Sequence, residues 1–417
     1  MIPDQALEAT SMRRLLAYVG ASLIAGGATV TDAENEVRRL GTHLGHPDVQ
    51  VSAHPTALTL SLASGEPSTV ERISSGLRLD QSLTVGEVRR DLMSDRITIA
   101  QAVLALGDAR RIPHRYGRAG FYGGLVLVSM GICLIMQPVV ANVLLAGLCS
   151  LMVSALMRGS TRHALLGALL PTVAAFVVSL VVLGSARMGI IDGPLRTLIC
   201  PIAVLLPGAL LSTGIAELAT GSMVSGTARF FQGIVQLLLF CLGVLAAGLV
   251  VQMPTSTLTN TRLDGLGWWA YVVGLAFIAL GITLSESVPW NLFGWTSLVL
   301  VATFLTQTTG QYYGHSLPVG AFFGAVVASF LSTLVEATRA NVPRLITFLP
   351  SFWLLVPGTL GLMGITTVGL GTGQAAAVYD VLGLVTSIAL GLLVGSALAL
   401  PYKRIARRMH HLGMLRR

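Results

Sequence analysis

Charged residues are scarce in this sequence. They make up 11% of the 417 residues, while apolar residues make up 53% and the mean hydropathy is +0.75. A soluble domain has about 25% charged residues, so this composition excludes an ordinary soluble protein and requires that lipid cover most of the surface. Most acidic residues lie within residues 1–118, and residues 119–400 hold few charges of either sign. We therefore predict a soluble N-terminal domain followed by a membrane domain.

Lysine and the common catalytic motifs are also missing. Lys403 is the only lysine, so the GxxxxGK[ST] phosphate-binding loop is absent and a primary pump within this chain is excluded. There is no HExxH or GxSxG motif, and the four cysteines, all in apolar segments, lack metal-ligand spacing. Glu34 and the His54-Pro55-Thr56 step leave a small hydrolytic site as an alternative. We predict that the protein is not an enzyme and needs no cofactor or metal.

One four-residue pattern occurs twice in the apolar part of the chain. Leu205-Leu206-Pro207-Gly208 recurs as Leu355-Val356-Pro357-Gly358, at a shift of about 150 residues, and Gly214, Ile215 and Gly221 meet identical residues at that shift. Each copy places a helix breaker in a segment long enough to cross a bilayer. Paired broken helices in corresponding halves are the sequence mark of a secondary transporter.

The apolar segments predict about ten membrane spans, taking about 20 residues for each crossing. They cover roughly residues 119–137, 139–157, 164–185, 197–218, 230–252, 266–285, 288–306, 316–336, 345–370 and 379–400. Because five crossings bring the second copy in from the opposite side, the two halves are expected to be 5+5 inverted repeats. The expected units are a cytoplasmic α+β domain (1–117), two five-helix membrane repeats (118–254 and 255–402) and a basic cytoplasmic tail (403–417).

The positive charges predict the orientation in the membrane. Arginines gather in residues 110–118 and again in the tail after Lys403. Because Lys and Arg favour cytoplasmic loops, we expect a multi-pass protein of the plasma (inner) membrane with both termini in the cytoplasm. The loop with Arg187 and Arg196, which this orientation places outside, agrees least with that preference. Topology and anionic lipid then account for the net charge of +8 without nucleic acid.

The soluble part has the pattern of a small α+β domain. Helical apolar spacing covers residues 7–25, 30–45, 84–93 and 98–109, with Thr98 as an N-cap and Gln101 placed for a capping box. Residues 49–53 and 57–62 alternate as strands do. The task of this domain stays open between gating the inner mouth, building an oligomer and sensing a ligand.

The Pro-Gly breaks are the leading candidates for a substrate site. A break exposes the N–H groups of the following half-helix at its positive dipole end, which suits the carboxylate of an amino acid. Nearby hydroxyls suit an ammonium group. A simple kink healed by neighbouring helices is the alternative. The predicted substrate-binding residues are Pro207, Gly208, Ser212, Thr213, Arg229, Gln232, Pro357, Gly358 and Thr359.

Two carboxylates are candidates for proton coupling. Glu217 follows the first break by about three turns, and Asp380 opens the last span. Ionisable groups at membrane depth are functional candidates by default, and Glu217 is predicted to couple protons with Arg229 as its partner. The alternatives are an interfacial Glu217–Arg229 pair and a helix N-cap at Asp380. Gln232 and Gln236 share a helix face and favour either a polar path or interhelical hydrogen bonds.

Eight short segments in both parts of the chain form a recognisable pattern. They are Gly27-Ala28-Thr29, Pro55-Thr56-Ala57, residues 96–102, residues 113–116, Leu206-Pro207-Gly208, residues 214–218, residues 225–229 and residues 350–361. Together they resemble the threonine/serine exporter family in its fused form, with a soluble domain ahead of two five-helix membrane halves. Glu217 stands where that family usually has Asp.

The resemblance implies export of L-threonine and L-serine driven by the proton motive force. The implied partners are a small amino-acid substrate, protons and the lipid bilayer. Split relatives of the family are thought to export dicarboxylates such as succinate, which is the alternative substrate class. A passive channel or a transporter subunit is the alternative mechanism, and homo-oligomerisation stays open.

Overall fold

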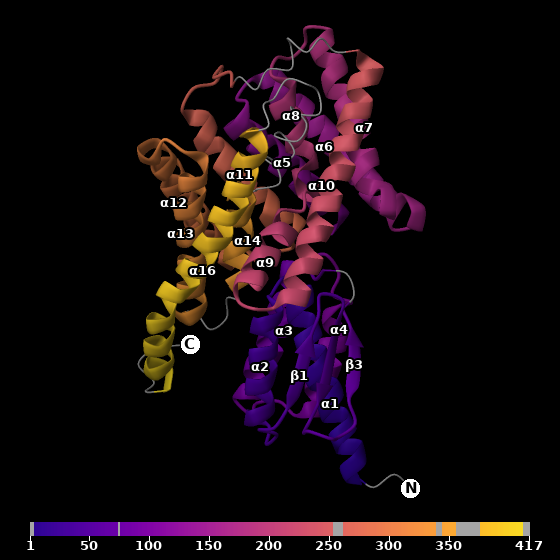
Figure 1. The fold of residues 1–417 in the computed structure, drawn as a ribbon, viewed down its shortest axis with the longest axis vertical. Helices are drawn as coiled ribbons and strands as arrows, with labels where there is room; N and C mark the ends of the chain where they lie inside the picture. The colour runs from indigo at the N-terminus through magenta and orange to yellow at the C-terminus, as the bar shows by residue number, and fades with distance from the viewer. Residues whose placement is uncertain (1–3, 74–75, 253–261, 339–343, 356–375, 412–417) are drawn as a thin grey trace.

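The chain forms a small N-terminal domain beside a larger bundle of helices (Figure 1). The computed structural model describes residues 4–73, 76–252, 262–338, 344–355 and 376–411. The C-terminal end of the last helix lies on the same side of the bundle as the N-terminal domain (Figure 1). This division agrees with the charge distribution of the sequence, because the apolar bundle holds few of the acidic residues.

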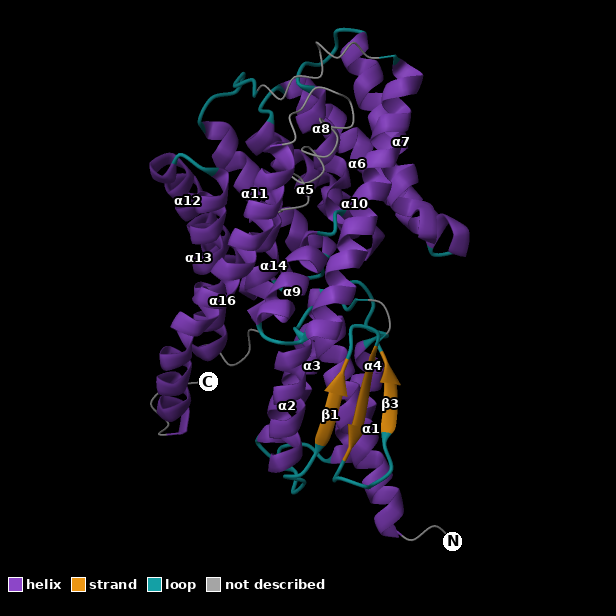
Figure 2. Ribbon diagram, in the orientation of Figure 1, coloured by secondary structure: helices purple, strands orange, loops and turns teal. Residues whose placement is uncertain are grey.

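Within its described residues, the N-terminal domain is an α+β fold of four helices and three strands. The helices are α1 (Asp4–Ala25), α2 (Val30–His43), α3 (Leu79–Met93) and α4 (Ile99–Ala109). The strands are β1 (Gln50–Ala53), β2 (Ala57–Ser61) and β3 (Thr69–Arg72), paired antiparallel in the order β1-β2-β3. The sheet lies against the helices (Figure 2), because β2 alternates and buries Leu58 and Leu60 in the same apolar core as Leu15 and Val37.

Local signals account for most of these elements. Thr98 caps α4 with the predicted capping box, in which Gln101 bonds back to the Thr98 N–H. The structure adds the strand β3, which the sequence pattern did not predict. Its four residues include only one strongly apolar side chain, Val70, and that side chain is exposed. It also begins α3 at Leu79, ahead of the predicted start at residue 84, because Asp80 is buried against Arg78 instead of facing water.

The bundle is built from two successive sets of helices. The first set is α5 (Gly117–Met136), α6 (Val140–Ser160), α7 (Ala164–Arg187), α8 (Pro194–Ile202) with the 3-10 turn η1 (Ala203–Leu205), α9 (Gly208–Ala219) and α10 (Met223–Val251). The second set is α11 (Trp269–Ser285), η3 (Trp290–Leu292), α12 (Phe293–Gly314), α13 (Leu317–Thr338), α14 (Arg344–Leu355) and α16 (Ala376–His411).

Among the described residues, seven helices are long and apolar enough to cross a membrane, or eight if the bent pair α8–η1 and α9 is one span. The helices α11 and α14 are shorter apolar helices. The predicted span 345–370 runs largely outside the described residues. The protein is thus a polytopic helical membrane protein, and the count of ten spans stays a prediction.

The helices α5 and α11 touch through glycines. A Cβ at Gly124 would lie 2.5 Å from the carbonyl oxygen of Gly281, and a Cβ at Gly131 would lie 2.7 Å from that of Gly274. Both contacts are too close for any side chain, so glycine lets the two backbones meet, as is common between membrane helices. Because the residue numbers in the two contacts run in opposite directions, the helices are antiparallel.

Candidate functional site

The first Pro-Gly pair breaks a helix, as the sequence predicts. The segment α8–η1 ends at Leu205, α9 begins at Gly208, and the two parts are bent by 65°. Pro207 and Gly208 are both buried. Within the described part of the chain, no side chain caps α9. The N–H groups of the first turn of α9 therefore lie inside an apolar segment without a side-chain acceptor.

The polar side chains around this break have different surroundings. The Nε2 group of Gln236 on α10 donates to the Leu205 carbonyl at 2.8 Å, which satisfies an acceptor that the break has freed. The Ser212 hydroxyl donates to the Gly208 carbonyl at 3.0 Å. Thr213 is half-buried, while Gln232 is exposed one turn before Gln236. Gln236 thus acts in the interhelical way that the sequence left open.

We expect Gln236→Ala to destabilise the broken span. Without the amide the Leu205 carbonyl loses its described donor, which costs about 1–3 kcal/mol for a buried acceptor. The thermal unfolding midpoint of the purified protein in detergent measures this loss. Gln232→Ala is the matched control, since an exposed substitution on the same helix shifts stability by less than about 0.5 kcal/mol. Equal midpoints for the two variants would show that the Gln236 contact does not support the break.

Glu217 and Arg229 form a buried ion pair between α9 and α10. Glu217 Oε2 lies 3.2 Å from Arg229 Nε, and their side chains are 0% and 11% exposed. The two helices approach closely because Gly214 and Gly226 face each other, and a Cβ at Gly226 would lie 2.7 Å from the Gly214 carbonyl oxygen. The pairing expected from the sequence is therefore present at the end of the bundle that faces the N-terminal domain.

The same carboxylate also binds the N-terminal domain. The Val30 N–H, the first in α2, donates to Glu217 Oε1 at 2.9 Å. Beside it, the hydroxyls of Thr31 and Ser222 are 2.8 Å apart. A carboxylate at a helix N-terminus is stabilised by the unpaired N–H groups and the helix dipole. Glu217 therefore joins the end of the broken span to the N-terminal domain, which sequence reasoning did not foresee.

A second carboxylate, missed by sequence reasoning, repeats this arrangement. Glu286 follows α11 and accepts the N–H of Leu79, the first residue of α3. It is half-buried. Burial, with a smaller contribution from the nearby Asp80, raises the pKa of Glu286 to about 7, although the Leu79 N–H and Arg78 act in the opposite direction. A single glutamate in a short loop carries no motif, so only the folded chain reveals it.

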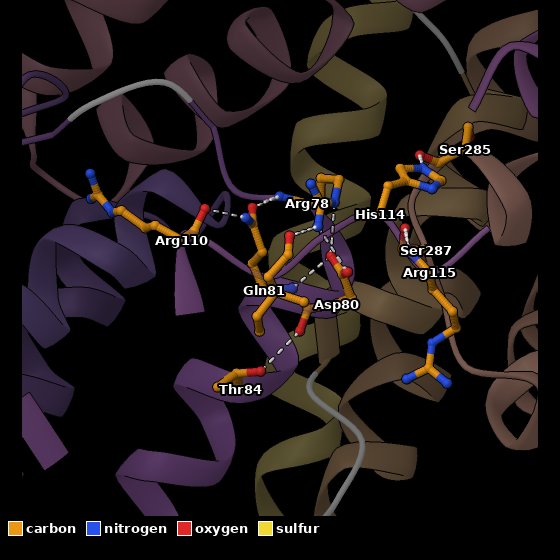
Figure 3. Close-up of polar contacts among 10 residues, drawn as sticks. Arg78, Asp80, Gln81, Thr84, Arg110, His114, Arg115, Ser285 and Ser287 are labelled. Carbon is orange, nitrogen blue, oxygen red and sulfur yellow. Dashed lines mark hydrogen bonds and ion pairs between the residues drawn. The ribbon is translucent and has the colours of Figure 1, made fainter. Parts of the chain in front are cut away.

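The segment between α4 and α5 also contacts the loop after α11 that contains Glu286. His114 Nε2 lies 3.0 Å from the Ser285 carbonyl oxygen, and the Arg115 N–H donates to Ser287 Oγ at 3.3 Å (Figure 3). The Tyr116 hydroxyl donates to the Val288 carbonyl at 2.8 Å. Figure 3 also shows Arg78 over Asp80, with the guanidinium making two contacts of 3.0 Å to the carboxylate.

Some predicted site residues cannot be placed at this site. Pro357, Gly358 and Thr359 lie outside the described residues, directly after α14 ends at Leu355. Asp380 is in the first turns of α16, and its side chain also lies outside the described part. Their roles stay predictions.

Glu34 and His54, the residues that suggested a hydrolytic site, make contacts within the N-terminal domain. Glu34 Oε1 accepts the Ala53 N–H at 2.9 Å, and Glu34 Oε2 pairs with Arg38 at 3.0 Å, which ties α2 to β1. The His54 N–H donates to the Ala57 carbonyl in the turn between β1 and β2. Among the described residues, no group of three His, Cys, Asp or Glu could hold a metal ion.

Comparison with known families agrees with these features. The ThrE family model, described as a threonine/serine exporter, matches residues 14–251, which is more than half of the chain. Comparison with curated proteins and with solved structures gives no match. The matched region contains most of the N-terminal domain, the break at Pro207 and the Glu217–Arg229 pair. The chain therefore belongs to the ThrE family of threonine/serine exporters.

Proposed function

We propose that this protein is a secondary active exporter that moves L-threonine and L-serine out of the cytoplasm, driven by the proton motive force. Family membership supports the substrate class. The observation that carries the mechanism is the broken span, whose second half begins with N–H groups that no described side chain caps and ends at the buried Glu217. Broken helices at membrane depth hold substrates in secondary transporters.

The proposed substrate site is the N-terminus of α9. The carboxylate of the amino acid accepts hydrogen bonds from the first N–H groups after Pro207, where the helix dipole favours negative charge. The Ser212 hydroxyl donates its proton to the Gly208 carbonyl, so its oxygen is left as an acceptor for the substrate ammonium, and Thr213 offers a second hydroxyl. Pro357, Gly358 and Thr359 are the proposed counterpart in the second half, whereas Arg229 pairs with Glu217 at the opposite end of α9 and Gln232 is exposed.

We propose that the two helix sets are inverted repeats. The pairs α5 and α11, α6 and α12, α7 and α13, α8 and α14, and α10 and α16 start about 150 residues apart. The glycine contacts support a two-fold relation: Gly124 corresponds to Gly274 and Gly131 to Gly281 at that shift, and each residue touches the counterpart of the other. Rocking of the halves about the contact of α5 with α11 would expose the site to each side in turn.

The packing of α10 and α16 gives a second, independent support. A Cβ at Gly243 on α10 would collide with the Thr172 carbonyl on α7, and a Cβ at Gly391 on α16 would collide with the Phe322 carbonyl on α13. Thr172 and Phe322 differ by 150 positions, and Gly243 and Gly391 differ by 148. The equivalent helices of the two halves thus meet their neighbours at equivalent places, as related repeats do.

In the proposed orientation the N-terminal domain and the tail are cytoplasmic, and the protein spans the plasma (inner) membrane. The C-terminal end of α16 and the N-terminal domain lie on the same side of the bundle (Figure 1), which suits the positive-inside distribution of arginine. Glu217 at the end of α9 is then near the inner mouth, where it is the proposed proton-coupling group, with Asp380 as the second candidate.

Efflux from proteoliposomes tests this function. The purified protein is reconstituted, and release of preloaded radiolabelled threonine, serine and succinate is followed with and without an imposed pH gradient. Saturable threonine or serine efflux that the gradient accelerates supports the proposal. Succinate efflux alone changes the substrate class, flux without saturation indicates a channel, and no flux of any solute contradicts transport by this chain alone.

A further inference from the structure

The N-terminal domain touches both helix sets at the end of the bundle that it covers. The start of α2 binds the first set through Glu217 and Ser222. The start of α3 binds the second set through Glu286. Leu79 and Leu83 of α3 are also buried in an apolar cluster to which both helix sets contribute, among them α5, α11 and α12. The contact is therefore polar at both helix starts and apolar between them.

Two further contacts reinforce the attachment to the second set. The segment before α5 bonds to Ser285, Ser287 and Val288 in the loop after α11. Asp32, in the first turn of α2, also attracts Arg344 at the start of α14. The two sets cannot move relative to each other at this end while the domain keeps all of these contacts.

We infer that the N-terminal domain is the cytoplasmic gate of the exporter, seated by Glu217 and Glu286, which each accept the first N–H of one of its helices, with Glu286 as the group that adjusts this seating to cytoplasmic pH. The gating consequence rests on the proposed transport function, whereas the seating itself is a property of the fold. Release of the domain from both helix sets is required before the cytoplasmic mouth opens.

The charged groups around Glu286 set the direction of its response. Arg78 and Asp80 face it from the start of α3, and His114 and Arg115 flank it from the segment before α5. The guanidinium of Arg78 is engaged with the Asp80 carboxylate at 3.0 Å. Arg78 therefore only partly offsets the burial that holds the pKa of Glu286 at about 7.

The sign of the effect follows from linkage. A glutamate in water has a pKa of about 4.3. Glu286 therefore binds its proton more tightly while the domain is seated than after the domain is released. Seating is then strongest in acid and weakens as the pH rises toward about 7, where the seated carboxyl loses its proton. Between about pH 6 and about pH 8 the seating equilibrium falls about tenfold. An acidified cytoplasm therefore closes the gate, and a more alkaline one frees it.

Hydrogen exchange on the full-length protein in lipid nanodiscs tests the seating without any transport measurement. In the wild type, the protection of the amides at residues 30–33 and 79–82 should fall about tenfold from about pH 6 to about pH 8, after correction for intrinsic exchange. Glu286→Gln keeps an acceptor for the Leu79 N–H but cannot ionise, so its protection should stay at the acidic level. Glu66→Gln, which changes an exposed carboxylate between β2 and β3, should behave as the wild type. Protection that does not depend on pH in the wild type, or that still depends on pH in Glu286→Gln, would overturn the role of Glu286.

A reversible crosslink tests the gate itself. The hydroxyl oxygens of Thr31 and Ser222 are 2.8 Å apart, so the pair Thr31→Cys and Ser222→Cys is placed to form a disulfide that fixes the domain to α10. Oxidation should stop threonine efflux from proteoliposomes, and reduction should restore it, while each single cysteine variant stays active. Full efflux from the crosslinked protein would rule out gating. If even the wild type shows no efflux, the proposed function fails, and the exchange experiment still decides the seating.

Discussion

Glu217→Gln is expected to abolish the acceleration of threonine efflux by a pH gradient while the protein still binds substrate. Each coupled proton contributes about 1.4 kcal/mol per pH unit, so a gradient of one unit should drive up to about a tenfold concentration ratio in the wild type and none in the variant. The glutamine still offers an oxygen to the Val30 N–H, which Glu217 accepts at 2.9 Å. The measurement is efflux from proteoliposomes at equal and unequal pH.

Two further variants separate proton coupling from stability in this prediction. The glutamine leaves Arg229 buried without its charge partner, which destabilises a buried pair by about 3–5 kcal/mol. The double variant Glu217→Gln with Arg229→Gln removes both charges and should recover much of that stability without recovering coupling. Glu217→Asp keeps the carboxylate and should remain coupled. Gradient-driven efflux that persists in the folded double variant would exclude Glu217 from the coupling step.

Gly124→Ala should prevent α5 and α11 from meeting. The new Cβ would lie 2.5 Å from the Gly281 carbonyl oxygen and 2.6 Å from the Ser285 backbone nitrogen, and neither backbone atom can rotate away. Forcing an extra carbon into a tight interior costs about 1–3 kcal/mol and more where backbone must shift. We expect a loss of about 3 kcal/mol or failure to fold, read as thermal midpoint and monodisperse yield in detergent.

Gly123→Ala is the matched control for this substitution. A Cβ at Gly123 meets no described atom within 4 Å, so the alanine should be neutral or stabilise α5 by up to about 1 kcal/mol through helix propensity. Gly281→Ala should resemble Gly124→Ala, because its Cβ would lie 2.6 Å from the Gly124 carbonyl oxygen. Equal stability of the Gly123 and Gly124 variants would show that the two helices do not need this close approach.

Much of the fold follows from signals that act over a few residues. The break at Pro207-Gly208 and the cap at Thr98 appear where the sequence predicts them, because a missing N–H and a capping hydroxyl act within one helical turn. The strand β3 was missed because an edge strand of four residues with an exposed Val70 lacks a clear alternation. The early start of α3 was missed because the partner of Asp80, rather than its local propensity, decides that it is buried.

The candidate site divides in the same way. Glu217 and Arg229 face each other across the short connection between α9 and α10, so their pairing could be proposed from the sequence. The contact of Glu217 with Val30 joins groups 187 positions apart. The contact of Glu286 with Leu79 likewise joins the second helix set to the N-terminal domain. Neither contact leaves a motif in the sequence. The donor in each is a backbone N–H at the start of a helix, and every residue except proline has that group.

The sequence by itself determined that the chain enters the membrane, where its helices break and which family it belongs to. These properties follow from the hydrophobicity of successive residues and from backbone chemistry at Pro207 and Gly208, which are local. Only the tertiary structure decided that Glu217 and Glu286 hold the N-terminal domain against both helix sets. A buried carboxylate takes whichever donor the fold brings within about 3 Å, and that choice depends on packing between segments far apart in the chain.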